Sequence, residues 1–193
     1  TNGFFGFQLL DRFNRMGCPL KMQILGLPNC AELKSKSYLC PMLVVVTGVS
    51  GTGKTTLGLG LSQALGIPFL DADDFHPPAN IEKMSSGEPL TDADRQPWLA
   101  SLAAKLLEME EKGGAVLACS ALKNAYREQL QVSESLRWIH LVGDRDLIWQ
   151  RMLARQNHYM KAGLLDSQLA IWEQPRVGHL VAISGTPAEV LEV

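Results

Sequence analysis

The chain has 193 residues, of which 46% are hydrophobic and 20% are charged, and its formal net charge at pH 7 is −2. These values are typical of a soluble globular domain that is large enough to bury a core. The sequence contains no stripe of Lys and Arg interleaved with aromatic residues, which argues against a nucleic-acid partner, and no apolar run long enough to cross a bilayer.

The first 41 residues show no clear hydrophobic period and no catalytic or phosphate-binding pattern. We interpret residues 1–41 as an N-terminal extension of unknown role and residues 42–193 as one domain. Cys18, Cys30 and Cys40 lie in or at the end of the extension, with spacings that match neither a zinc site nor a C-x-x-C pair. Disulfide bonding is therefore not indicated, and we expect a reducing, cytoplasmic location.

An apolar segment, Leu43 to Val46, leads directly into the pattern G-x-x-x-x-G-K-T. Glycines in such a loop let successive N–H groups point toward a polyphosphate, and the helix that follows adds its positive N-terminal end. We expect Lys54 to reach the outer phosphates and the Thr55 hydroxyl to bind Mg²⁺. The expected phosphate-binding residues are Gly48, Val49, Ser50, Gly51, Thr52, Gly53, Lys54, Thr55 and Thr56. The alternative is a glycine-rich turn that only links a strand to a helix.

Strands and helices alternate along the rest of the domain, which predicts an α/β fold with a parallel sheet covered on both faces. Apolar runs predict strands at 43–46, 67–70, 115–119, 137–142 and 179–183. Helices are predicted at 55–65, closed by Gly66, at 97–112, at 124–130 and from Asp144 to about residue 155. The apolar face of the 97–112 helix would comprise Leu99, Leu102, Ala103, Leu106 and Leu107, with a capping-box pair, Thr91 and Asp94, near its approach.

A second capping pattern, Thr186 to Glu189, lies close to the end of the sequence. It predicts a helix that the chain is too short to finish, so we expect the domain to be truncated at its C-terminus.

Acidic residues follow the second predicted strand, at the edge of a parallel sheet where ligands bind. Asp73 is our candidate for the base that accepts a proton from a phosphoryl acceptor, and Asp71 is expected near Mg²⁺. The alternative is a solvated acidic turn in which Asp74 caps the next segment. His76 either contacts the acceptor or only braces the loop.

Basic residues follow the next two elements. Arg95 has the planar fork that binds a carboxylate through two hydrogen bonds. Ser120 and Lys123 follow the third strand, and Arg127 lies one turn beyond Lys123, where a solvated basic face explains it equally well. Two further residues are interpreted as packing: Trp98 and Cys119, the latter a small buried residue rather than a nucleophile.

The sequence resembles the gluconate kinase family of P-loop small-molecule kinases in four blocks that occur in the family's order. The first is the phosphate loop. The second runs from Asp71 to Pro77 and on through residues 80–84 and 87–99; the third is Ala118 to Lys123 with Tyr126 and Arg127; the fourth is similar to the family's mobile lid and includes Arg151 to Arg155, His158 to Met160 and Leu164 to Gln168. The second block is the most specific, because unrelated ATPases and GTPases also carry a phosphate loop.

The resemblance implies transfer of the γ-phosphoryl group of ATP to the 6-hydroxyl of D-gluconate, with Mg²⁺ as cofactor. It also implies a three-layer P-loop NTPase fold of the nucleoside-monophosphate-kinase type, with a helical lid at about 151–168 and a tendency to form homodimers. The lid arginines Arg151 or Arg155 would close over the phosphates. His76, Arg95 and His158 would bind the polyol and its carboxylate, with Ser120, Lys123 and Arg127 as further candidates.

Two departures from the family pattern affect these expectations. Gln156 and Asn157 precede His158 where family members commonly carry a glycine, and the last strand lacks an aspartate that they often show near the adenine. The alternatives are a shikimate-type or nucleotide kinase on the same fold, and a nucleotide-binding switch that does not transfer phosphate. The switch would predict a guanine-reading N-K-x-D motif or a hydrophobic strand that ends in a Mg²⁺-linked Asp, and the sequence contains neither.

Overall fold

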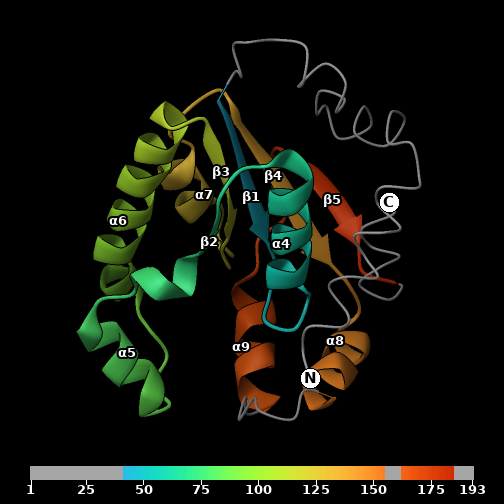
Figure 1. Ribbon diagram of the computed structural model, residues 1–193. Coiled ribbons are helices and arrows are strands. Elements are labelled where there is room, and N and C mark those ends of the chain that lie inside the picture. Colours follow the sequence, from blue (N-terminus) through green and yellow to red (C-terminus); the bar gives the residue numbers. More distant parts are fainter. Residues whose placement is uncertain (1–40, 155–161, 185–193) are drawn as a thin grey trace, which may run out of the picture.

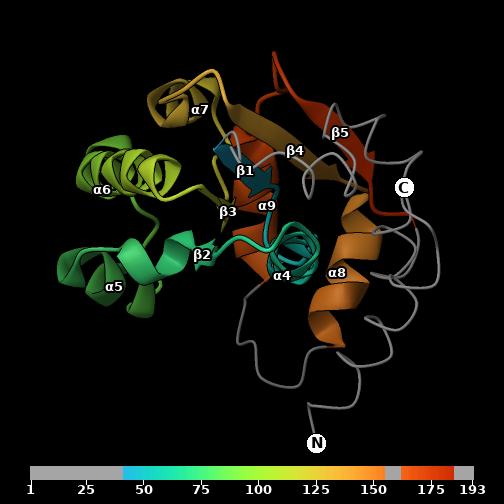
Figure 2. The same ribbon diagram turned by 45° about the horizontal axis from the view of Figure 1, so that its top comes forward.

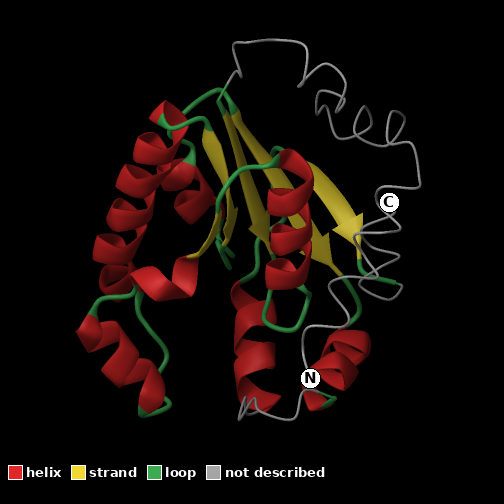
Figure 3. Ribbon diagram, in the orientation of Figure 1, coloured by secondary structure: helices red, strands yellow, loops and turns green. Residues whose placement is uncertain are grey.

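The computed structural model describes residues 41–154 and 162–184, except for the side chains of residues 162–164. Figures 1 and 3 show strands in the centre and helices around them. In chain order the elements are β1 (Met42–Thr47), α4 (Lys54–Leu65), β2 (Phe69–Asp71), the 3-10 helix η1 (Ala72–Phe75), α5 (Pro78–Ser85), α6 (Asp92–Glu111), β3 (Gly114–Ala118), α7 (Asn124–Leu130), β4 (Leu136–Val142), α8 (Arg145–Leu153), α9 (Ala162–Ile171) and β5 (His179–Ala182).

The five strands form one sheet in the order β2-β3-β1-β4-β5, and every neighbouring pair is parallel. The central strand β1 pairs Val45 with Leu117 of β3 on one side and with Trp138 of β4 on the other. Because parallel strands are covered on both faces, β1 is a continuous apolar run, and its residues 43–46 are fully buried. All five strands therefore end at the same edge of the sheet, which is the lower edge in Figure 1.

Helices cover the sheet on both faces, as Figure 2 shows. On one face α6 and α7 contribute Leu99, Leu102, Leu106, Tyr126 and Leu130 to a core that includes the inward side chains of β1, β3 and β4. On the other face α4, α8 and α9 pack with the alternate residues of the same strands. The predicted three-layer α/β P-loop fold is confirmed. None of the described helices combines the length and apolar character needed to cross a membrane.

Helix α6 begins earlier than the sequence analysis predicted. It starts at Asp92 rather than at residue 97, because the capping box of Thr91 and Asp94 is itself the helix N-terminus and Pro97 lies within the helix. Leu107 is 47% exposed, so its predicted place on the buried face is wrong. The short elements η1 and α5 were not predicted, whereas α7 has the predicted bounds and Gly66 closes α4 with a positive φ of 69°.

A buried histidine connects β1, β4 and the segment before β5. His140 is 1% exposed, and its Nε2 lies 2.9 Å from the Val177 carbonyl oxygen, to which it donates. Its Nδ1 therefore accepts from the Thr47 hydroxyl at 2.6 Å. Burial lowers the pKa of His140 to about 4, although the bond to the Val177 carbonyl acts in the opposite direction. The imidazole is thus neutral in the folded protein at pH 7.

This burial predicts a loss of stability in mild acid. The unfolded chain binds a proton at His140 below pH about 6.5, whereas the folded chain does so only near pH 4, so the free energy of unfolding falls as the pH drops through this window. The full effect is on the order of 3 kcal/mol. Urea unfolding of the wild type and of His140→Gln at several values between pH 4 and pH 7.5 measures it. The variant should show a smaller pH slope; equal slopes would contradict the assignment.

Candidate active site

The phosphate loop lies between β1 and α4 and needs glycines for two different reasons. Gly48 and Gly51 have positive φ angles of 147° and 87° and no room for a side chain. A Cβ at Gly48 would lie 2.8 Å from the Leu141 carbonyl oxygen, and one at Gly51 would lie 2.6 Å from Cγ of Met152. Gly53, at φ 98°, has open space around it, so only its backbone conformation requires glycine.

Lys54 and Thr55 begin α4 at the mouth of this loop. The Lys54 ammonium donates to the Val49 carbonyl oxygen at 3.2 Å, and the exposed Thr55 hydroxyl donates to Oδ2 of Asp71 at 3.4 Å. Thr55 and Asp71, the two residues predicted to bind Mg²⁺, therefore lie side by side. In the part of the chain that the structure describes, no group of three or more His, Cys, Asp or Glu side chains could hold a metal ion.

The acidic segment after β2 forms η1, and its cap is Asp71 rather than Asp74. Oδ1 of Asp71 accepts from the Asp73 N–H at 3.2 Å, and Pro77 occupies the N-cap position of α5. The interpretation of Asp74 as a cap is therefore wrong. Asp73 itself is exposed.

The buried end of β3 lies close to both halves of the site. Cys119 is 1% exposed, and burial raises the pKa of its thiol to about 12, so the prediction of a packing residue is confirmed. The charges of Lys54, Asp71 and Asp73 all act on this thiol. Thr55, next to Lys54, contacts Asp71, which accepts from the Asp73 N–H, so the phosphate-loop lysine and the predicted base lie at the same edge of the sheet.

His76 is fixed against the predicted packing residue Trp98. The two rings stack with centroids 4.4 Å apart and planes 9° apart, and Trp98 donates from Nε1 to the Ala72 carbonyl oxygen at 2.7 Å. Burial lowers the pKa of His76; Asp73 raises it and Arg95 lowers it further. Asp73 and Arg95 thus both lie near enough to His76 to influence its charge. Nδ1 of His76 is buried without a hydrogen-bond partner.

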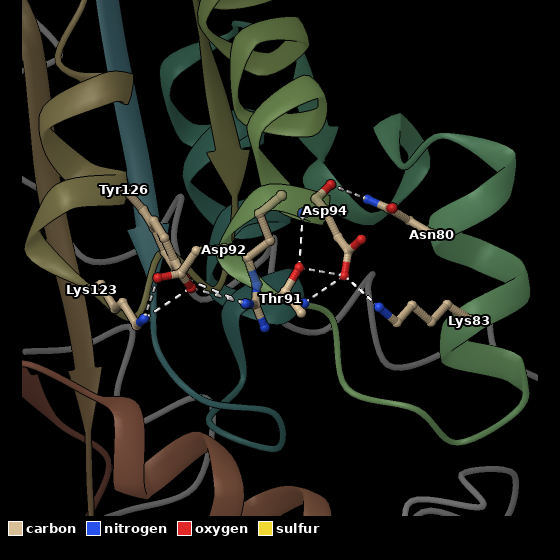
Figure 4. A network of polar contacts seen from close by, with 8 residues as sticks. Asn80, Lys83, Thr91, Asp92, Asp94, Lys123 and Tyr126 are labelled. Atoms are coloured by element: carbon tan, nitrogen blue, oxygen red, sulfur yellow. Dashed lines mark hydrogen bonds and ion pairs between the residues drawn. The ribbon is translucent and has the colours of Figure 1, made fainter.

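A carboxylate at the start of α6 contacts two of the cations predicted to bind the acceptor, on what we call the acceptor side (Figure 4). Asp92 accepts two hydrogen bonds from the Lys123 ammonium, at 2.7 and 2.9 Å, and one from the Tyr126 hydroxyl. Nη1 of Arg95 lies 3.5 Å from the same carboxylate. The hydrogen bond from Lys123 lowers the pKa of Asp92, which in turn raises the pKa of Lys123.

A second carboxylate attaches α5 to the start of α6, also in Figure 4. Oδ2 of Asp94 accepts from the Thr91 N–H at 2.7 Å and from the Lys83 ammonium at 2.7 Å. The Asp94 carbonyl oxygen accepts from Nδ2 of the buried Asn80 at 2.8 Å. The hydrogen bonds from Lys83 and Thr91 keep the pKa of the Asp94 carboxyl well below its usual range. The segment from η1 to α6 is therefore held as one unit on the acceptor side.

Arg127 does not lie on the solvated basic face that the sequence left open as an alternative. It is 5% exposed, so the proposed solvated basic face is wrong. Its Nη2 donates to the carbonyl oxygens of Leu122 and Glu173, both at 2.8 Å, and its Nη1 donates to Oδ1 of Asn124 at 2.8 Å. These bonds connect α7 to the chain that follows α9. The guanidinium is committed to this junction, and the geometry does not favour substrate binding.

The other predicted residues are distributed as follows. Ser120 is half-buried in the loop after β3 and precedes Ala121, whose φ of 35° is positive. Arg151 donates from Nη2 to the Ile183 carbonyl oxygen at 2.9 Å. Arg155 and His158 lie outside the described residues. One contact was not predicted: Gln168 of α9 bonds to Ser50 in the phosphate loop. No local pattern distinguishes this glutamine from an exposed one.

The fold and site define the class of protein. A glycine loop enters a helix from the central strand of a 2-3-1-4-5 parallel sheet, and acidic and basic groups face it at the same edge, which is the arrangement of a P-loop kinase. The family model for shikimate kinase matches residues 50–173.

The nearer relatives are gluconokinases. A gluconokinase of Gluconobacter oxydans is 49% identical over 146 residues, which are 75% of this chain and 82% of that protein. The thermoresistant gluconokinase of Escherichia coli is 41% identical over 69% of this chain and 77% of its own. A crystal structure of a gluconokinase from Sinorhizobium meliloti superimposes with a TM-score of 0.73 at 39% identity, covering 80% of this chain and 90% of that one. The chain therefore belongs to the gluconokinase family, within the shikimate kinase-like P-loop kinases, which use ATP.

We predict that Arg127 contributes to stability rather than to substrate binding. Arg127→Met should lower the free energy of unfolding by about 2–3 kcal/mol, because it removes three hydrogen bonds: the donor to the Glu173 carbonyl oxygen, one of two donors to the buried Leu122 carbonyl oxygen, and the bond to Asn124. Chemical denaturation measures the loss. Arg176→Met is the matched control, because Arg176 also bonds to α7, through Glu128, but its side chain is 75% exposed. This variant should change the free energy of unfolding by no more than about 0.5 kcal/mol. A large rise in the acceptor KM without loss of stability would reverse the conclusion.

Proposed function

We propose that this protein is a gluconokinase, which transfers the γ-phosphoryl group of ATP to the 6-hydroxyl of D-gluconate and gives 6-phospho-D-gluconate and ADP. The observation that carries the proposal is the contact of the Thr55 hydroxyl, which follows Lys54, with the carboxylate of Asp71, which in turn accepts from the Asp73 N–H. A phosphate-binding lysine and a candidate base thereby share one site. The acceptor is proposed from the 41% and 49% identity to proteins named gluconokinase.

On the nucleotide side, the N–H groups of the loop over residues 48–56 and the Lys54 ammonium would bind the phosphates of ATP. Thr55 and Asp71 offer two oxygen ligands within 3.4 Å of each other, and oxygen ligands are those that Mg²⁺ prefers. Phosphates and water would have to supply the remaining ligands. When bound, Mg²⁺ would neutralise charge on the transferring group.

On the acceptor side, Asp73 would accept the proton of the 6-hydroxyl as its oxygen bonds to the γ-phosphorus and ADP leaves with the electrons of the broken P–O bond. The lowered pKa of His76 keeps its imidazole neutral at pH 7, so the ring suits hydroxyl groups rather than a carboxylate. Arg95 and Lys123 would bind the carboxylate of the sugar acid.

One observation favours a second acceptor class. The family model that matches residues 50–173 is that of shikimate kinase, and shikimate is also a hydroxylated carboxylic acid. The same cations would suit either acid. The proposal for D-gluconate rests on the higher similarity to gluconokinases, and the assay below includes both.

Three further predictions accompany this function. We propose a kinase domain over residues 42–193 with a lid at about 151–168, assembly as a homodimer, and a cytoplasmic location. Arg151 and Arg155 remain the candidate lid arginines, and His158 remains a candidate ligand for the polyol.

The first test is the rate of Mg²⁺- and ATP-dependent ADP formation with D-gluconate, shikimate, AMP or buffer alone. Turnover should require D-gluconate. Asp73→Asn should reduce kcat by about 10²–10⁴-fold, because the acceptor proton loses its base. Asp74→Asn is the matched control, since this neighbouring carboxylate is also exposed; its kcat should change less than about threefold. Equal losses in both variants would refute Asp73 as the base, and turnover with shikimate alone would refute the acceptor.

The second test concerns the carboxylate of the acceptor. Arg95→Lys should raise the KM for D-gluconate about tenfold and leave the KM for ATP within twofold, because a lysine retains the charge but not the planar pair of donors. Arg137→Lys, at an exposed arginine of β4, is the control and should change neither value. Steady-state kinetics with each substrate varied in turn gives both constants. A parallel rise in both constants would place Arg95 outside the acceptor site.

A further inference from the structure

Gln168 of α9 binds the phosphate loop through both of its amide atoms. Its Oε1 accepts from the Ser50 backbone N–H at 2.7 Å, and its Nε2 donates to the Ser50 hydroxyl at 3.2 Å. Figures 1 and 2 both show α9 beside the loop that enters α4. The side chain is half-buried, and Ser50 and Gln168 are 118 residues apart in the sequence. The contact is therefore a tertiary feature of the site.

Ser50 follows the residue whose carbonyl oxygen accepts several of the hydrogen bonds within the loop. The preceding carbonyl, that of Val49, accepts from the Lys54 ammonium at 3.2 Å and from the Thr52 hydroxyl at 2.8 Å. The peptide that carries the Ser50 N–H is thus held on its carbonyl side by the loop and on its N–H side by Gln168. Together these three hydrogen bonds fix the orientation of one peptide plane.

Helix α8 contacts the next residue of the loop and is attached to α9. Gly51 packs so closely against Met152 that an added Cβ would lie 2.6 Å from its Cγ. Arg145 of α8 forms two hydrogen bonds with Asp166 of α9, from Nε at 2.6 Å and from Nη2 at 3.0 Å. The phosphate loop therefore lies against both α8 and α9. The two helices are bonded to each other through Asp166, which is two residues before Gln168.

The chain after α9 is attached to the acceptor side. The Glu173 N–H donates to the Leu122 carbonyl oxygen at 2.9 Å, and a Glu173 carboxylate oxygen accepts from the Asn124 N–H at 2.7 Å. One short helix thus connects the loop that would bind phosphates to the loop that precedes Lys123.

We propose that Gln168 is a positioning residue of the phosphate loop, which orients the Ser50 peptide so that the loop is preformed for the nucleotide. The proposal relies on the proposed function only in taking an adenine nucleotide as the ligand of the loop. Without Gln168 the Ser50 peptide can rotate, and binding of phosphate must then order it, which weakens affinity. A glutamine that merely competed with phosphate for the Ser50 N–H would have the opposite effect, because its removal would tighten binding.

The test is the dissociation constant of Mg·ADP, measured by isothermal titration calorimetry without any acceptor. Gln168→Met, which keeps the length of the side chain but removes both hydrogen bonds, should weaken binding about five- to tenfold. Gln150→Met is the matched control, because Gln150 is an exposed glutamine of α8. The dissociation constant of Mg·ADP for this variant should stay within twofold of the wild-type value. Unchanged or tighter binding in Gln168→Met would overturn the proposal.

Gln168→Glu supplies a readout that a purely structural role would not affect. Its carboxylate can still accept from Ser50 but places a negative charge beside the diphosphate, so it should bind Mg·ADP more weakly than Gln168→Met. The difference between the two variants should shrink as salt rises from 0.05 to 0.5 M, because salt screens the repulsion. A difference that salt does not change would contradict the placement of Gln168 at the phosphates. If Gln168→Met does not fold, Gln168→Glu alone tests the proposal. Binding of Mg·ADP by Gln168→Glu as tight as that by the wild type would then overturn it.

Kinetics separate this proposal from the proposed function. In Gln168→Met the KM for ATP should rise about as much as the dissociation constant, while the KM for D-gluconate stays within twofold. An equal rise in both values would indicate general disruption and would overturn the positioning role. Absence of turnover with D-gluconate in the wild type would refute the proposed acceptor and leave the Mg·ADP result valid.

Discussion

The site depends on the close packing of the phosphate loop against its neighbours at Gly48 and Gly51. At both positions the space that a side chain would need is already occupied, by the Leu141 carbonyl of β4 and by Met152 of α8. The glycines therefore do more than permit positive φ angles, because they allow a strand and a helix to approach the loop directly. Since β4 is paired with β1, the loop is fixed by the same sheet that directs the other strands to this edge.

The charges around Asp92, in the proposed acceptor site, suit a ligand with one carboxylate. Arg95 and Lys123 carry two positive charges, and Asp92, which contacts both, carries one negative charge. This cluster therefore has one net positive charge, and its carboxylate keeps the two cations from repelling each other when no ligand is bound. The nearby neutral His76 adds hydrogen-bonding capacity without charge. Such an arrangement favours a monoanionic, hydroxylated acid over a more highly charged acceptor.

Local sequence patterns predicted the parts of the molecule that local forces determine. The glycine loop, the αL cap at Gly66 and the bounds of α7 follow from spacing within a few residues. The predicted start of α6 near Pro97 is wrong, because the capping box of Thr91 and Asp94 marks the boundary and Pro97 lies within the helix. The buried role of Arg127 and the contact between Gln168 and Ser50 depend on segments 46 and 118 residues away, and helical periodicity shows only which residues share a face, not what covers that face.

Helix α9 and the chain after it connect the phosphate loop to the loop between β3 and α7. Its side chain at Gln168 contacts the phosphate loop, and the chain after its last residue is bonded to the loop between β3 and α7. Such a connection fixes the two loops at the same edge of the sheet, and it suits a kinase, which must keep water away from the transferring phosphoryl group. The buried Arg127 reinforces the acceptor end, where its guanidinium bonds to the carbonyl oxygens of both Leu122 and Glu173.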